Sequence, residues 1–150
     1  MTKVSAAVQS PTRNRIATKT ITFDGSSGKG QAAGNTVFFT VTGEVMILSV
    51  VPFCTTNLAE AAPTATIALG VVNSTSLFIA ATTAVNIDAD EFWVDTAPDP
   101  NGVAVPSALM DIAITQNIVA AVASQNVNGG VLRIDVIWTP LSSGASLVAA

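Results

Sequence analysis

The chain has 150 residues, of which 49% are hydrophobic and 11% are charged, and it contains neither histidine nor tyrosine. This composition excludes intrinsic disorder for most of the chain, and a chain of this length can bury a core without a metal or a disulfide. Acid–base or nucleophilic catalysis would have to use carboxylates or the single cysteine, so we expect no enzyme and no catalytic residue.

The net charge of −4 is unevenly distributed along the chain. Residues 1–30 carry five of the six basic side chains and one acidic side chain, whereas residues 31–150 carry one basic and nine acidic side chains. This distribution predicts a basic arm on an acidic body, suited to an acidic protein surface or to a neighbouring subunit. The charges are too sparse for nucleic acid, since phosphate binding gathers several basic residues on one patch. The candidate partner-binding residues of the arm are Lys3, Arg13, Arg15 and Lys19.

The N-terminal part predicts an arm, a first strand and a loop. Residues 1–20 show no hydrophobic period, and Pro11 opposes a helix, so we predict an extended or loosely ordered arm. Residues 21–24 begin the first strand, and the Gly/Ser-rich residues 25–34 predict a flexible loop.

Two further strands follow this loop. Residues 35–42 alternate, which places Val37 and Phe39 on one face and Phe38 on the other. Residues 44–53 form a nearly continuous apolar run, which predicts a central strand that is covered on both faces.

The middle of the chain predicts a hairpin and a short strand. Residues 64–72 and 76–81 have the pattern of two strands joined by the polar turn 73–75. Residues 92–94 form a short strand among acidic residues, and a loop with Pro, Asn and Gly follows at 97–106.

The last third predicts three strands and a tail. Residues 109–115 alternate, and residues 118–124 and 131–139 flank an Asn/Gly-rich turn at 125–130. The alanines of 118–124 also suit a helix, but the surrounding β pattern favours a strand, which we expect. The side chains expected to face one way are Met110, Ile112 and Ile114 in the first strand, and Leu132, Ile134, Val136 and Trp138 in the last.

About eight short strands separated by turns predict an all-β fold. We expect a single-domain antiparallel β-sandwich, jelly-roll-like, over residues 21–142, after the arm 1–20 and before a loose tail at 143–150. Residues 2–20 lack the pattern of a signal peptide, and the longest apolar run, 45–54, is too short to span a bilayer. We therefore expect synthesis in the cytoplasm and no membrane partner.

Three stretches contain residue types that occur in phosphate-binding, nucleophilic or cation-binding sites. Residues 25–30 (GSSGKG) lack the glycine spacing of a phosphate loop and the hydroxyl residue after its lysine. Cys54 lies among apolar residues with no histidine to activate it, so we expect a buried thiol. The acidic residues 88–99 lack the calcium-loop spacing, and we expect a solvated loop or a partner contact. We predict no cofactor and no metal, while cation binding by the acidic loop stays an open alternative.

Pairs of adjacent large apolar residues indicate whether the protein is a monomer or an oligomer. Phe92 and Trp93 are neighbours on a short strand, so one side chain should point inward and the other outward. A monomer would then expose more apolar surface than a chain with 11% charge tolerates, which favours an oligomer. Phe92 and Trp93 are the candidate residues for that contact. The same argument applies to the pairs Phe38–Phe39, Leu77–Phe78 and Ile137–Trp138.

Several stretches resemble small structural proteins of tailed bacteriophages. They are residues 43–58 (GEVMILSVVPFCTTNL), 65–70 (ATIALG), 78–83 (FIAATT), 92–95 (FWVD) and 131–140 (VLRIDVIWTP). The family concerned is that of head decoration, or cement, proteins and related small virion structural proteins. The resemblance carries over no catalytic or ligand residue.

The resemblance implies a β-sandwich that sits on the exterior of the capsid as a homotrimer. Its partners would be the major capsid protein and its own copies, and its location would be the virion. Two alternatives stay open. One is a tail, neck or fibre-tip component of a phage, and the other is a carbohydrate-binding jelly roll. A surface that binds sugar rings would need several outward aromatic residues. The chain has only two tryptophans and no tyrosine, which does not favour this alternative.

Overall fold

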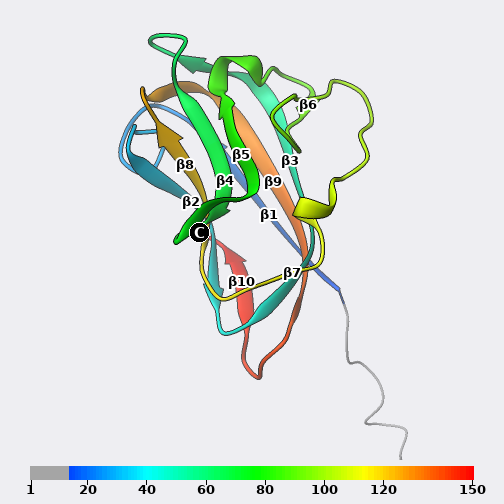
Figure 1. Ribbon diagram of the computed structural model, residues 1–150. Coiled ribbons are helices and arrows are strands. Elements are labelled where there is room, and N and C mark those ends of the chain that lie inside the picture. The colour runs from blue at the N-terminus through cyan, green and yellow to red at the C-terminus, as the bar shows by residue number, and fades with distance from the viewer. Residues whose placement is uncertain (1–13) are drawn as a thin grey trace, which may run out of the picture.

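The computed structural model describes residues 14–150, which form ten strands in two antiparallel five-stranded sheets (Figure 1). The first sheet has the order β1 (Arg15–Thr22), β9 (Val127–Pro140), β3 (Val45–Glu60) and β6 (Glu91–Phe92), and β7 (Ile112–Ile114) also pairs with β3. The second sheet has the order β10 (Ser146–Ala149), β2 (Gly34–Thr42), β8 (Ile118–Ala123), β4 (Thr66–Val71) and β5 (Ser74–Thr83). Two 3₁₀ turns, η2 (Ala84–Asn86) and η3 (Ser107–Leu109), lie in the connections.

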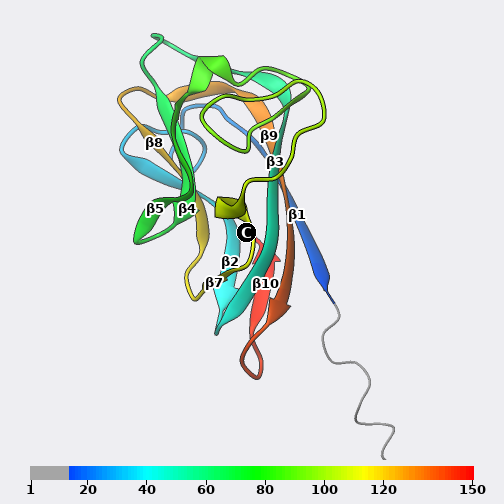
Figure 2. The same cartoon turned by 45° about the vertical axis from the view of Figure 1, so that its right-hand side comes forward.

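The strand pairing is nested. β4 pairs with β5, β3 with β7, β2 with β8, and β1 with β9, and successive pairs alternate between the two sheets. This is the arrangement of a jelly roll, in which one long folded-back chain is wrapped into two facing sheets (Figure 2). The predicted all-β sandwich is confirmed, and residues 118–123 form a strand as expected. Within residues 14–150, no helix has the length and apolar character needed to cross a membrane.

The core lies between the sheets and is built from alternate side chains. Along β9, the residues predicted to share one face are all at most 4% exposed, while the residues between them are half-buried. These buried residues of β9 are Leu132, Ile134, Val136 and Trp138, and Val127 at the start of the strand is buried as well. Ile67, Leu69 and Ile118 of the opposite sheet are completely buried. This alternation confirms the predicted inward face of the last long strand.

A β-bulge in β2 overturns two predictions from alternation. Val37 pairs with Val119 and Phe39 with Ile118, so Phe38 is an extra residue in this strand. A bulge sets two residues against one on the partner strand and breaks the alternation of faces. Phe38 and Phe39 are therefore both 0% exposed, whereas Val37 is 36% exposed. The predictions that Val37 and Phe39 share a face and that one of the two phenylalanines is exposed are wrong.

Both ends of the described chain contain more structure than predicted. The predicted arm ends at residue 20, but β1 begins at Arg15 and pairs without interruption along β9. The tail predicted as loose, 143–150, contains β10, which pairs with β2. Both strands lie at sheet edges. β1 carries mostly polar residues and β10 has only four residues, so neither shows the hydrophobic period of a central strand. Residues 1–13, with Lys3 and Arg13, lie outside the described residues.

The strand predicted at 109–115 is shorter than expected. Its first residue, Leu109, is the last residue of η3, and only Ile112–Ile114 pair with β3. Met110 was expected to share the inward face with Ile112 and Ile114, but it is 37% exposed. Leu109, at the end of η3, is buried in its place, because a 3₁₀ turn does not keep the alternation of a strand.

The bulge predicts different effects of substitution at two adjacent positions. Phe38→Ala should lower the free energy of unfolding by about 3–5 kcal/mol, because it leaves a cavity in the core. Val37→Ala should change it by about 0.5 kcal/mol, because the Val37 side chain lies at the surface. Equilibrium denaturation of both variants measures the difference. Equal losses at the two positions would contradict the bulge.

Candidate functional site

The two predicted basic residues within the described chain lie on β1, an edge strand of the first sheet. Arg15 and Lys19 pair with Trp138 and Ile134, so their side chains start on the inner face of the sheet. The guanidinium carbon of Arg15 lies 5.2 Å from the centre of the Trp138 ring. The Lys19 ammonium donates a hydrogen bond to the backbone oxygen of Ala150, beside β10. Both cations therefore occupy the seam between the two sheets.

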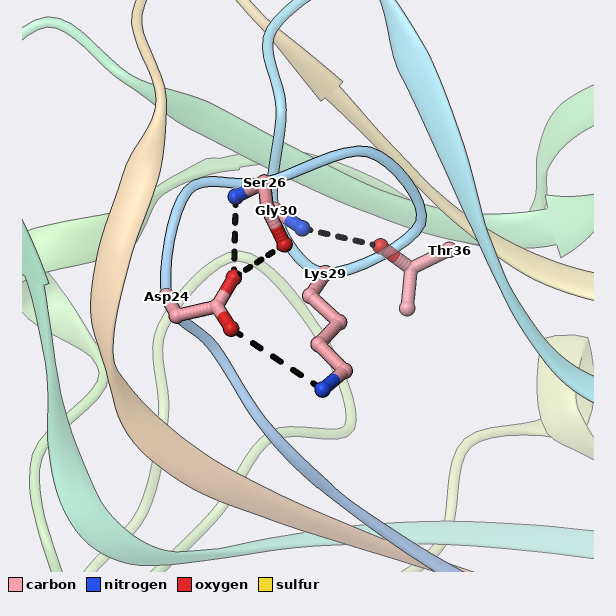
Figure 3. Close-up of polar contacts among 5 residues, drawn as sticks. All are labelled: Asp24, Ser26, Lys29, Gly30 and Thr36. Carbon is pink, nitrogen blue, oxygen red and sulfur yellow. Dashed lines mark hydrogen bonds and ion pairs between the residues drawn. The ribbon is translucent and has the colours of Figure 1, made fainter.

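A compact loop between β1 and β2 brings a third cation to this seam (Figure 3). The Asp24 carboxylate accepts a hydrogen bond of 2.9 Å from the Ser26 amide and another from the Ser26 hydroxyl. Its other oxygen lies 3.9 Å from the Lys29 ammonium. The hydrogen bonds from Ser26, and then the charge of Lys29, lower the pKa of Asp24. The loop predicted as flexible is thus held by its own polar contacts.

Gly30 closes this loop for a steric reason. Its φ is +103°, and a Cβ at this position would lie 2.1 Å from the backbone oxygen of Val127. Its amide donates to the Thr36 hydroxyl at 3.2 Å, which satisfies a buried group (Figure 3). The glycines of this stretch therefore serve backbone geometry, in agreement with the rejection of a phosphate loop.

A hollow of about 330 Å³ lies between β1 and this loop. Its walls include the ammonium-bearing side chains Lys19 and Lys29 and the outward-facing Val37 of β2. Of the four basic residues in 14–150, three lie on β1 or beside this hollow, and the fourth is Arg133. We name Arg15, Lys19 and Lys29 with the edge of β1 the basic seam. Lys29 was not among the predicted site residues, because only the folded loop brings it beside Lys19.

The two predicted aromatic residues have different surroundings. Trp93 is completely buried, and its indole N–H donates to the Thr82 hydroxyl at 3.0 Å. It is a core residue, and its side chain presents no surface to a partner. Phe92 is half-buried, and its ring packs edge-on against Phe53 with centroids 4.9 Å apart. The prediction that one side chain points inward and the other outward is confirmed.

Phe92 belongs to an apolar face that sequence reasoning found only in part. Phe53 lies beside it on β3, and the Arg133 guanidinium carbon lies 5.2 Å from the Phe53 ring centre. Arg133 also pairs with Asp135 at 3.0 Å. We define the outer apolar face as the outward side chains of the first sheet, namely Ile16, Val51, Phe53, Phe92 and Ile137 around this ion pair. Phe53 was missed because its apolar run was expected to be covered on both faces.

The acidic stretch 88–99 forms local hydrogen bonds. Asp88 accepts from the Asn57 amide group at 2.8 Å, and Glu91 accepts from the backbone N–H of Asp88 at 2.9 Å. Asp95 accepts from the backbone N–H of Ala97 at 2.7 Å. No group of three or more metal-ligating side chains occurs among residues 14–150.

Comparisons with known proteins give one likeness of fold. No protein-family model and no curated protein sequence matches the chain. Among solved structures, the chain is similar to a chain of the cyanophage Pam1 capsid asymmetric unit, with a TM-score of 0.54 and 15% sequence identity. The alignment covers 93% of this chain and 97% of that chain. At this identity, the likeness shows a shared fold over nearly the whole length of both chains.

The surroundings of Cys54 predict an unreactive thiol. Cys54 is completely buried, its thiol donates to the Thr56 backbone oxygen at 3.1 Å, and burial raises its pKa to about 11. At about pH 8 only about one thiol in a thousand is ionised, and the thiolate is the nucleophile. A chromogenic disulfide reagent should therefore react slowly with the native protein and rapidly after denaturation. A Cys54→Ser/Thr55→Cys variant, with its thiol at an exposed position, is the control and should react rapidly. Rapid reaction of the native Cys54 would contradict this account.

Proposed function

We propose that this protein is a structural component of a phage virion, which binds the outer surface of the capsid and stabilises it as a decoration protein. The observation that carries this proposal is the full-length likeness of fold to a chain of a phage capsid assembly. A jelly roll is also a usual architecture of viral capsid domains. In this proposal the protein has no enzymatic activity, and its role rests on its surfaces.

The charge distribution supports a defined orientation on the capsid. The basic seam lies on one side of a body that otherwise carries mostly acidic side chains. An acidic capsid surface would attract the basic seam and the two basic side chains of residues 1–13, Lys3 and Arg13. It would repel the acidic remainder of the body. Charge complementarity of this kind favours one docking orientation over others. The partner in this proposal is the major capsid protein, and the location is the capsid exterior.

The aromatic side chains do not favour the carbohydrate-binding alternative. Trp93 and Trp138 are at most 4% exposed, so neither can form a flat platform for a sugar ring. Of the phenylalanines, Phe53 and Phe92 are half-buried and the others are buried. The rings of Phe53 and Phe92 pack against each other. A tail, neck or fibre-tip location is distinguished from the capsid by locating the protein in dissociated virions.

Truncation of the N-terminal residues tests the proposal. The truncation has to stop at residue 13, because removal of residues 1–20 would delete most of β1 and expose the edge of β9. Loss of Lys3 and Arg13 should leave the melting temperature unchanged and weaken co-sedimentation with capsids that lack this protein. Each exposed ionic contact contributes about 0.2–1 kcal/mol, and several copies on one oligomer multiply the effect.

The control for this truncation keeps the length and changes only the charge. A Lys3→Glu/Arg13→Glu variant should reproduce the loss in part, and added salt should weaken the intact protein in the same way. Capsid binding by the truncated protein that equals binding by the intact protein would show that residues 1–13 are not the anchor.

The proposed homotrimer predicts a defined mass in solution. Light scattering should give the mass of three 15.2-kDa chains, because the outer apolar face would otherwise stay in contact with water. Ile16 is 73% exposed on this face, so Ile16→Asp should favour dissociation without unfolding the protein. Val148→Asp, at a 53% exposed position on the other sheet, is the matched control and should leave the mass unchanged. A monodisperse monomer of the wild-type protein would contradict the oligomer.

A further inference from the structure

We propose that the free edge of β1 is a docking site at which an extended, acidic segment of a partner chain adds as a further strand. The inference deepens the proposed function and rests on it in one respect: the segment is taken to belong to the capsid. Addition of a strand to an open sheet edge is a common mode of peptide recognition, in which main-chain hydrogen bonds supply affinity and side chains supply specificity.

β1 differs from the other sheet edges among the described residues. Edge strands of stable proteins are usually short, bulged or covered, because an open edge invites pairing with other chains. β6, β7 and β10 have two, three and four residues. β5 is longer, but its pairing with β4 is interrupted at two places. β1 pairs with β9 over eight residues without interruption, and no described strand lies beyond it (Figure 2).

The register identifies which backbone groups of β1 are free. The Phe23 amide, which directly follows β1, donates to the Gly130 backbone oxygen at 2.9 Å, so residue 23 faces β9. Backbone groups alternate between the two sides of an antiparallel strand, so the odd-numbered residues of β1 also face β9. The N–H and C=O groups that point away from the sheet therefore belong to Ile16, Thr18, Thr20 and Thr22.

A hollow lies where an added strand would need room. The 330 Å³ space beside β1 is bordered by residues 19–22, the loop with Gly28 and Lys29, and Val37 of β2. The paired residues of β10 end at Ala149, opposite Phe39, and the Ala150 backbone N–H donates to the Phe38 backbone oxygen at 3.0 Å, whereas Val37 lines the hollow. The second half of the β1 edge, residues 19–22, therefore borders this hollow.

The charges of the basic seam indicate which kind of segment can bind at the edge of β1. β1 carries Arg15 and Lys19 and no acidic residue, and Lys29 borders the hollow. A second copy that presented its own β1 would bring these cations against their equivalents, and like charges on paired strands are destabilising. A segment with carboxylates opposite Lys19 and Lys29 would be attracted instead. The seam therefore opposes edge-to-edge self-association and fits a foreign acidic strand.

Substitution of Thr20 tests the backbone contact. Proline is tolerated in an edge strand where its nitrogen faces away from the sheet, so Thr20→Pro should retain the pairing with β9. It removes one free N–H from the docking edge, whereas Thr20→Ala keeps this N–H and removes only the side chain. In co-sedimentation with capsids that lack this protein, Thr20→Pro should bind about tenfold more weakly than the wild type, and Thr20→Ala within about twofold. Thermal unfolding of both variants verifies that they are folded.

A second experiment does not depend on the capsid. The full-length protein, labelled with ¹⁵N, is titrated with an alternating valine–glutamate octapeptide and separately with a valine–lysine octapeptide. The glutamate peptide should slow amide exchange at Thr18, Thr20 and Thr22 and shift the resonances of Lys19 and Lys29. The lysine peptide should do neither.

The outcomes separate this inference from the proposed function. Failure of the wild-type protein to bind capsids contradicts the proposed function, and the peptide titration then decides the docking edge alone. Capsid binding by Thr20→Pro that equals binding by Thr20→Ala overturns the docking edge and leaves the proposed function standing. Peptide-induced shifts around Phe53 and Phe92, equal effects of both peptides, or no shifts at all also overturn it.

Discussion

The pairing of β9 with β3 is the interaction on which the rest of the structure depends. β9 lies between β1 and β3, and β3 in turn holds β6 and β7, so this pair forms the centre of the first sheet. The inner face of β9 also supplies four of the buried side chains of the core. Because β1 pairs only with β9, the position of the basic seam follows from the same pair.

The sandwich separates two kinds of surface that have different roles in the proposed function. The basic seam lies at one side of the sandwich, where Lys19 and Lys29 border a hollow along an unpaired strand edge. The outer apolar face lies on the first sheet, where Phe53 packs against Phe92 and lies beside Arg133, which pairs with Asp135. An edge and a face of one sheet point in different directions, so the proposed capsid contact and the proposed contact between copies would use different surfaces.

Local sequence patterns predicted the regular parts of the fold. The strict alternation of residues 131–139 predicted the inward face of β9, and the apolar run around Val50 predicted a central strand. They could not predict the bulge at Phe38, because an inserted residue leaves no mark on hydrophobicity. They also missed most of β1 and all of β10, whose residues gain their strand conformation from a partner strand.

The sequence by itself determined the all-β class, the burial of Cys54 and the concentration of basic residues before residue 31, since composition and period are local properties. Only the tertiary structure decided that Lys29 joins Lys19, that Phe53 faces outward beside Phe92 and that Trp93 is a core residue. Only the tertiary structure left the edge of β1 open. The physical reason is that strand order and edge exposure arise from contacts between residues far apart in the sequence, such as Thr18 and Asp135, and these contacts have no periodic signature.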